Sequence, residues 1–181
     1  MPMVDRQDLE QLFRGQGLDD FRWISPANIR VAQWVRMKCQ YGCPEHGNRV
    51  ACPPNNPSVA ECERFLREYR EAVIFHFPKA VEDRQERRRW SREVNERLLA
   101  LEREVFLRGH YKAFVLLMGS CPHCEECVGD PAECPHPGSA RPTPEGLAVD
   151  LFATARSVGY PLEVLTDYSQ TMNRYAILLI E

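Results

Sequence analysis

The sequence predicts an α/β fold in which a mixed, mostly parallel sheet is flanked by helices. Short apolar segments typical of buried strands alternate with longer segments of helical periodicity along the chain. The 181 residues are 44% hydrophobic and 27% charged, an ordinary balance for a soluble domain with a sizeable core. No linker, repeat or low-complexity segment divides them, so we expect residues 1–181 to form a single domain.

The first half of the chain predicts two helices and two strands. Residues 4–14 carry apolar side chains at helical spacing and precede two glycines, which predicts a short helix. Residues 29–35 alternate loosely between apolar and polar types, which predicts a strand. Residues 58–71 begin with the capping box Ser58-Val-Ala-Glu61 and predict a helix, and the apolar run 72–77 predicts a buried strand.

The second half continues the alternation. Residues 82–108 predict a long helix with one apolar seam, and residues 111–118 predict another buried strand. A helix is expected over residues 143–158, because proline after Thr143 suits a first helical position. Residues 162–165 and 175–180 predict a closing pair of strands. Strands separated by helices favour parallel pairing through right-handed crossovers, with antiparallel pairing at one edge.

Charge and hydropathy exclude several classes of protein. The net charge of −3 supplies no general basic face, so we expect no nucleic-acid partner. The arginines of Glu86-Arg-Arg-Arg89 lie among acids, which predicts a solvated helix face with i,i+4 ion pairs. The N-terminus lacks the apolar core of a secretory signal, and no apolar run is long enough to span a membrane. A cytoplasmic location follows, where eight cysteines indicate metal or redox chemistry rather than disulfides.

A cluster of cysteines follows the strand predicted at 111–118. Its members are spaced C-x2-C-x2-C-x6-C and are Cys121, Cys124, Cys127 and Cys134. Deprotonated thiolates are soft ligands, and this close spacing lets one turn of backbone point several sulfurs at one centre. Bacterial ferredoxins use a similar run with a last gap of three residues, whereas the gap here is six. An iron–sulfur cluster is the favoured interpretation, and zinc or disulfides are the alternatives. His123 or His136 could replace one thiolate.

A second set of cysteines lies in the Gly- and Pro-rich loop 39–57. Cys39, Cys43 and Cys52 are spaced C-x3-C-x8-C, and a loop with so little apolar content needs a metal or a neighbouring loop to order it. Three thiolates leave one coordination position open unless Cys62 or His46 fills it. Cys62 falls on the apolar stripe of a predicted helix, where a core cysteine is the simpler interpretation.

The two cysteine loops are expected to be neighbours at the carboxyl edge of the sheet. Each follows a predicted strand, at 29–35 and at 112–118, and open α/β sheets bind ligands at this edge. Two arrangements stay open: each loop holds its own cluster, or Cys52 and Cys134 exchange between two clusters. If the first loop is catalytic, Glu45, His46 and Arg49 are candidate acid–base or anion-binding groups.

Taken together, these motifs resemble a family of small prokaryotic proteins described as predicted metal-binding proteins of unknown function. The resemblance rests on the two cysteine patterns, on the prolines after Cys43 and Cys52, and on Arg141-Pro-Thr-Pro-Glu145 with Gly146-x3-Asp150. It covers roughly residues 39–159 and implies metal binding with an iron–sulfur cluster, without an assigned reaction. The family pattern has an arginine after its last cysteine, and this chain has Pro135 there.

Three functions are compatible with the sequence. The first is a redox protein in which one or two [4Fe–4S] clusters pass electrons to an unidentified redox protein partner or serve a larger enzyme. The second is an enzyme in which Cys39, Cys43 and Cys52 hold a cluster whose open position binds a small-molecule substrate. The third is a zinc-stabilised binding module without redox activity.

Overall fold

The computed structural model describes residues 4–121, 123–167 and 169–181. In these residues one sheet has the strand order β1-β2-β4-β3. Its strands are β1 (Phe21–Ile24), β2 (Ala72–Lys79), β3 (Phe114–Leu116) and β4 (Met172–Leu179). Every neighbouring pair is antiparallel, and Val73 of β2 lies opposite both Trp23 of β1 and Leu178 of β4. The α/β class is therefore confirmed.

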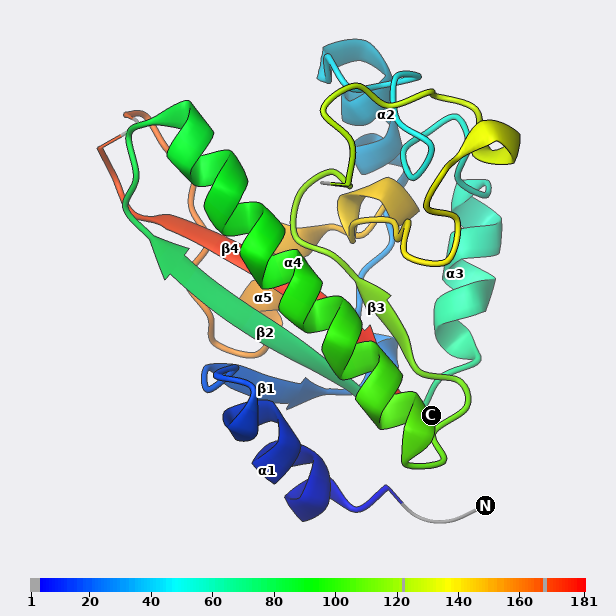
Figure 1. The fold of residues 1–181 in the computed structure, drawn as a ribbon, viewed down its shortest axis with the longest axis vertical. Coiled ribbons are helices and arrows are strands. Elements are labelled where there is room, and N and C mark those ends of the chain that lie inside the picture. Colours follow the sequence, from blue (N-terminus) through cyan, green and yellow to red (C-terminus); the bar gives the residue numbers. More distant parts are fainter. Residues whose placement is uncertain (1–3, 122, 168) are drawn as a thin grey trace.

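Helices cover both faces of the sheet (Figure 1). Helices α1 (Arg6–Gly15) and α4 (Arg84–Leu107) share a core with one face, and α3 (Val59–Arg67) and α5 (Leu151–Ser157) share a core with the other. Alternate residues of β2 enter the two cores, as the strand period of two requires. Helix α2 (Gln33–Gly42) lies beyond the sheet, beside the loop that contains the second cysteine set. No helix in the described part of the chain is long and apolar enough to cross a membrane.

The prediction of a mostly parallel sheet was wrong. Strands β2 and β4 are buried between two helical layers, so both of their faces are apolar and their sequences read as continuous hydrophobic runs. Such runs are typical of parallel sheets, whose strands are also covered on both faces. Strand direction depends on which segments pair across the sheet, and the local pattern does not contain that information.

The strand predicted at 29–35 was also wrong. Ile29 and Val35 are buried, but they belong to separate pieces of backbone. Residues Pro26–Asn28 form a 3-10 helix, Val31 makes an isolated antiparallel bridge with Val149, and α2 begins at Gln33. Cys39 therefore lies on a helix, and the first cysteine loop does not leave the carboxyl end of a strand.

The helix predicted at 143–158 is interrupted. A 3-10 helix, Glu145–Leu147, ends at Ala148, whose φ of 61° is in the left-handed region. The Val31–Val149 bridge follows, and Asp150 then caps α5 by accepting a hydrogen bond from the Ala153 N–H at 2.9 Å. Strand β1 had not been predicted, and residues 162–165 form no strand. The other predicted helices and strands are present with shifted ends.

Candidate metal centre

The second cysteine loop is anchored where the chain leaves β3. The buried side chain of Asn95 on α4 accepts from the Met118 N–H at 3.2 Å and donates to the Met118 carbonyl at 3.1 Å. Both groups lie beyond the end of β3 and would otherwise be buried without partners. Met118 is three residues before Cys121. Asn95 therefore fixes the point from which the cysteine loop starts.

A buried ion pair fixes the other end of the loop. The Arg141 guanidinium donates to both carboxylate oxygens of Glu102, with the shortest contact at 2.7 Å between Nη2 and Oε1. The same carboxylate accepts from the Val115 N–H at 3.0 Å. Glu102 thus joins α4, β3 and the end of the loop, because bidentate guanidinium–carboxylate pairs constrain both partners. The loop has two rigid anchors.

The four cysteines of this loop line one small cavity of about 10 Å³. Cys121 is buried, and the other three are partly exposed. Burial raises the pKa of the Cys121 thiol, a hydrogen bond from the His123 backbone partly opposes this, and the thiolates of Cys127, Cys134 and Cys124 add to the rise. The other lining residues are Arg49, Val50, His123, Val128, Pro135 and His136. A metal cation would relieve the repulsion among the thiolates, so the donor set suits a soft metal.

The two histidines of the loop lie together at this cavity. Their ring centroids are 5.3 Å apart, and Nε2 of His123 lies 3.2 Å from the Ser139 carbonyl oxygen. A carbonyl can only accept, so this contact assigns the Nε2 proton and leaves Nδ1 of the neutral His123 ring as an acceptor. His123 and His136 are thus both placed where an imidazole could replace a thiolate.

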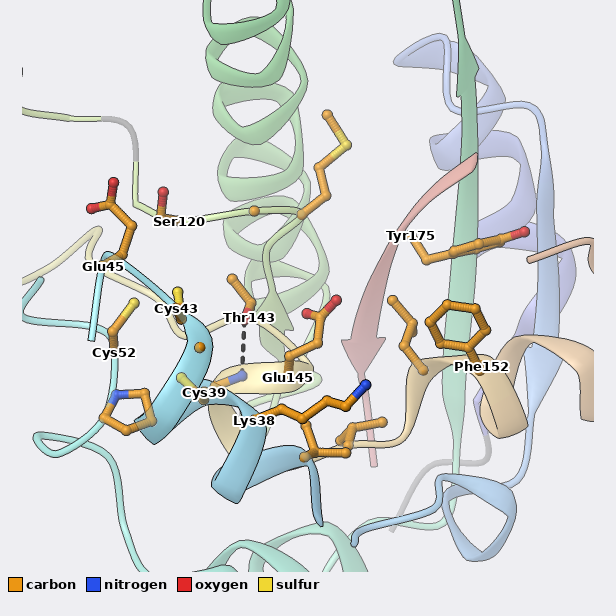
Figure 2. Close-up of a pocket in the computed structure, with 18 of the residues that line it drawn as sticks. Lys38, Cys39, Cys43, Glu45, Cys52, Ser120, Thr143, Glu145, Phe152 and Tyr175 are labelled. Atoms are coloured by element: carbon orange, nitrogen blue, oxygen red, sulfur yellow. Dashed lines mark hydrogen bonds between the residues drawn. The ribbon is translucent and has the colours of Figure 1, made fainter. Parts of the chain in front are cut away.

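The first cysteine set surrounds the C-terminal end of α2 (Figure 2). Cys39 lies in the last turn of the helix, Cys43 is its C-cap, and Cys52 follows in a series of turns. Burial raises the pKa of the Cys52 thiol to about 11, and the thiolates of Cys39 and Cys43 add to this shift. These mutual effects place the three sulfurs near one another. A cation would favour their charged forms.

The two residues proposed as a fourth ligand of the first set, Cys62 and His46, lie in different surroundings. Cys62 lies on α3 and is buried in the hydrophobic core that α3 shares with the sheet. Its Sγ donates to the Pro57 carbonyl at 3.5 Å and lies 4.0 Å from Nη2 of Arg36. Burial raises the pKa of its thiol. The predicted burial of Cys62 in the core is therefore confirmed. His46 is partly exposed in the turn after Cys43.

The two cysteine loops contact each other directly, as the sequence predicted. The Val50 N–H donates to Sγ of Cys127 at 3.4 Å, and the Asn55 amide donates to the Gly129 carbonyl at 2.9 Å. Arg49 pairs with Glu45 at 2.6 Å and reaches the Cys124 carbonyl at 3.5 Å. The reason given for this proximity was wrong, since the first loop follows a helix rather than a strand.

The donor set fits a metal, although the thiols do not stand in the geometry of a completed site. Among the described residues, no three His, Cys, Asp or Glu side chains are grouped closely enough to hold an ion as they stand. Binding would therefore draw the sulfurs of a set together and release their protons, because thiolates rather than thiols are the ligands. Each set lies on a short loop held at fixed points, which allows such a movement.

A large cavity of about 1120 Å³ adjoins the first cysteine set. Its walls come from α2, from the 143–152 segment and from β4, and Figure 2 shows Glu145 between the cysteines and the aromatic side of the cavity. The apolar part includes Trp34, Met37, Leu151, Phe152, Leu162 and Tyr175. Cys39, Cys43 and Cys52 line the same space, so a molecule in this cavity would lie against them.

Lys38, Glu145 and Arg174 are charged residues of this cavity that the sequence had not indicated as candidate site residues. Much of the Glu145 side chain is exposed, but it faces the cavity, and burial raises the pKa of its carboxyl. Burial likewise lowers the pKa of Arg174, which the Glu145 carboxylate partly opposes. The sequence signal for Arg174 was an arginine in a mostly apolar strand, because a charge there is costly without a role.

Comparisons with known proteins agree with the cysteine patterns and the metal-compatible loops. Neither the curated proteins nor the solved structures contain a match to this chain. A family model described as "Predicted metal-binding protein (DUF2284)" matches residues 22–180, a span that includes both cysteine sets and the whole sheet apart from the first residue of β1. The chain therefore belongs to this family of predicted metal-binding proteins.

Proposed function

We propose that this chain is an iron–sulfur redox protein whose cluster is held by Cys121, Cys124, Cys127 and Cys134. The observation that carries the proposal is the gathering of these thiols around one cavity between two rigid anchors. Bound there, a [4Fe–4S] cluster would accept and donate single electrons. The chain's own residues would hold the cluster and set its surroundings.

Two contacts suit a cluster at the second cysteine set. The Val50 N–H donates to the Cys127 sulfur, and hydrogen bonds to cluster sulfurs are a known control of reduction potential. The hydrogen bond to Glu45 is the main cause of the raised pKa of the Arg49 guanidinium, and the thiolates of Cys127 and Cys121 add to it, so Arg49 would offset negative charge on the ligands. Both groups come from the first loop, which would therefore tune a cluster held by the second.

Zinc is the alternative that the small cavity favours. About 10 Å³ between the thiols suits a single ion with little movement, whereas a cluster requires the loop to open. Four thiolates in tetrahedral geometry are a common structural zinc site, closed to substrate. In that case the protein would be a colourless binding module.

The large cavity supports a second candidate function, an enzyme with an open-coordination cluster on Cys39, Cys43 and Cys52. These cysteines line about 1120 Å³ of mostly apolar space, a size that accommodates a small organic substrate. Glu145 could exchange a proton with such a substrate, and Arg174 could bind an anionic group on it. Glu45 and Arg49 are paired with each other, and the two cysteine loops meet at this pair.

Anaerobic purification with analysis of iron, zinc and sulfide on one sample tests these proposals. We expect visible absorption that bleaches with dithionite and about four irons per cluster. Cys124→Ala should remove the redox-active cluster. Cys43→Ala should contain less iron than the wild type only if the first set holds its own cluster. Stoichiometric zinc in a colourless protein would overturn the redox proposal. Iron that survives Cys124→Ala unchanged would contradict its assignment to the second loop.

A further inference from the structure

The N-terminal half of α4 carries arginines along one side. Arg84, Arg88 and Arg92 are spaced by four residues and, with Arg89, line a groove of about 850 Å³. The opposite wall is the segment Met118–Cys121, which runs beside α4 to the second cysteine set (Figure 1). We call this space the arginine groove. It adjoins the large cavity, and five residues line both spaces: Glu45, Met118, Gly119, Ser120 and Arg174.

The charge in the arginine groove is unbalanced. Its lining contains seven arginines and three glutamates. One of the glutamates, Glu45, is already paired with Arg49 at 2.6 Å. The other acidic residues are Glu125 and Glu126, which are exposed in the cysteine loop. The groove therefore concentrates positive charge in a chain whose net charge is −3.

Four arginines of α4 lack the partners expected for an ordinary helix surface. Among the described residues, Arg84, Arg88, Arg89 and Arg92 form no ion pair and no side-chain hydrogen bond. Arginines on other helices do pair with acids four residues away, as Arg14 does with Glu10 at 3.1 Å. Like charges at i,i+4 destabilise a helix, so the stripe is unfavourable without an anion. The i,i+4 ion pairs predicted for Arg88 and Arg89 are thus absent.

The floor of the groove is built to present a guanidinium. Gly119 has a φ of 72°, and a Cβ at this position would lie 3.2 Å from Nη1 of Arg174. Glycine permits both this backbone conformation and the close approach of the arginine. Burial lowers the pKa of Arg174, so its cationic form would gain from a nearby anion.

We propose that the arginine groove binds a small molecule carrying two or more phosphate groups, beside the second cysteine set. The guanidinium group of arginine can donate two parallel hydrogen bonds to the oxygens of one phosphate. The volume of the groove lies within the usual range of about 300–1000 Å³ for small-ligand sites. The groove is lined mainly by polar groups and contains no aromatic residue among the described residues. It would therefore bind the phosphate groups of a ligand rather than an attached ring. The site requires neither iron nor zinc for its charge.

Calorimetric titration of the full chain, purified anaerobically with its metal, with sodium tripolyphosphate tests this site. We expect saturable binding that weakens as salt is raised. The double variant Arg88→Gln/Arg92→Gln should bind at least about tenfold more weakly, because charge-assisted hydrogen bonds are lost. The control Arg64→Gln/Arg103→Gln removes the same charge from exposed positions outside the groove and should bind as the wild type does.

Four results would overturn the proposal. The first is an absence of tripolyphosphate binding by the wild type, and the second is equal weakening in both double variants, which would indicate only general charge attraction. The third is tighter binding of polyglutamate or of a single-stranded oligonucleotide, which would assign the groove to an acidic protein or a nucleic acid. A groove variant that binds normally but has a shifted reduction potential would show that the arginines only offset metal-site charge, and would also contradict the proposal.

Discussion

The Val50 N–H donates a hydrogen bond to Sγ of Cys127, which lies 77 residues further along the chain, at a distance of 3.4 Å. Residues of both cysteine loops therefore form the candidate metal centre. The neighbouring Arg49 strengthens the link through the Cys124 carbonyl. Substitutions in the first loop should therefore alter metal binding at the second.

Arg49→Gln should weaken metal binding at the second cysteine set. The change removes the 2.6 Å ion pair with Glu45 and the 3.5 Å contact to the Cys124 carbonyl. Loss of groups that orient metal ligands typically costs about 10-fold or more in affinity. Release of iron or zinc to a coloured chelator measures this loss. Arg64→Gln, on an exposed helix surface, is the control, and equal release from both variants would show that the first loop gives the site no support.

Arg141→Ala should destabilise the protein by about 3 kcal/mol, because it leaves the Glu102 carboxylate buried without its cation. The matched control is Arg67→Ala, whose ion pair with Glu63 is exposed and should contribute less than about 1 kcal/mol. Urea unfolding of the metal-loaded protein measures both changes. Similar losses for the two variants would mean that the Glu102–Arg141 pair is not an anchor of the loop.

Cys62→Ala should leave the metal content unchanged. Its thiol is buried in the core with the Pro57 carbonyl as its hydrogen-bond acceptor, and it lies outside both cysteine sets. We expect a stability loss of about 1 kcal/mol from the small cavity created in the core. Metal analysis beside Cys124→Ala checks the assignment. Loss of metal in Cys62→Ala, with the fold intact by circular dichroism, would make Cys62 a ligand.

Glu145→Gln should stabilise the protein increasingly as pH rises above the ordinary carboxyl pKa of 4.5. Burial raises the pKa of Glu145, so the folded protein binds this proton more tightly than the unfolded chain does. The wild type therefore has this contribution in full at low pH and loses it as pH rises through the raised pKa, whereas glutamine has no proton to lose. Urea unfolding of both proteins at a series of pH values above 4.5 measures the difference in their free energies of unfolding.

Glu61→Gln provides a control of opposite sign. Hydrogen bonds from Ser58 lower the pKa of Glu61, so its contribution is present at neutral pH and is lost as pH falls. A Glu145→Gln difference that does not change with pH would show that this carboxyl is solvated as in the unfolded chain.

Local features of the sequence determined helices α1, α3 and α4 and the grouping of the cysteines. The capping box of Ser58 and Glu61 begins α3, and the apolar seam of α4 packs on the sheet. Both depend on residues within a few turns of each other, so they can be read without the rest of the fold. The cysteines of each set are likewise close in sequence, and ligand spacing is a local property.

Only the tertiary structure decided the direction of the strands and the residues that surround the candidate metal centre. Ile29 and Val35 are buried as a strand would bury them, yet the Val31–Val149 bridge and α2 divide this segment. Arg174 reaches the cysteine region because β4 lies between β2 and β3. Strand pairing joins residues far apart in the chain, and its free energy depends on which partners meet. The hydrophobic pattern of one segment shows that the segment is buried, but it does not show which strands lie beside it.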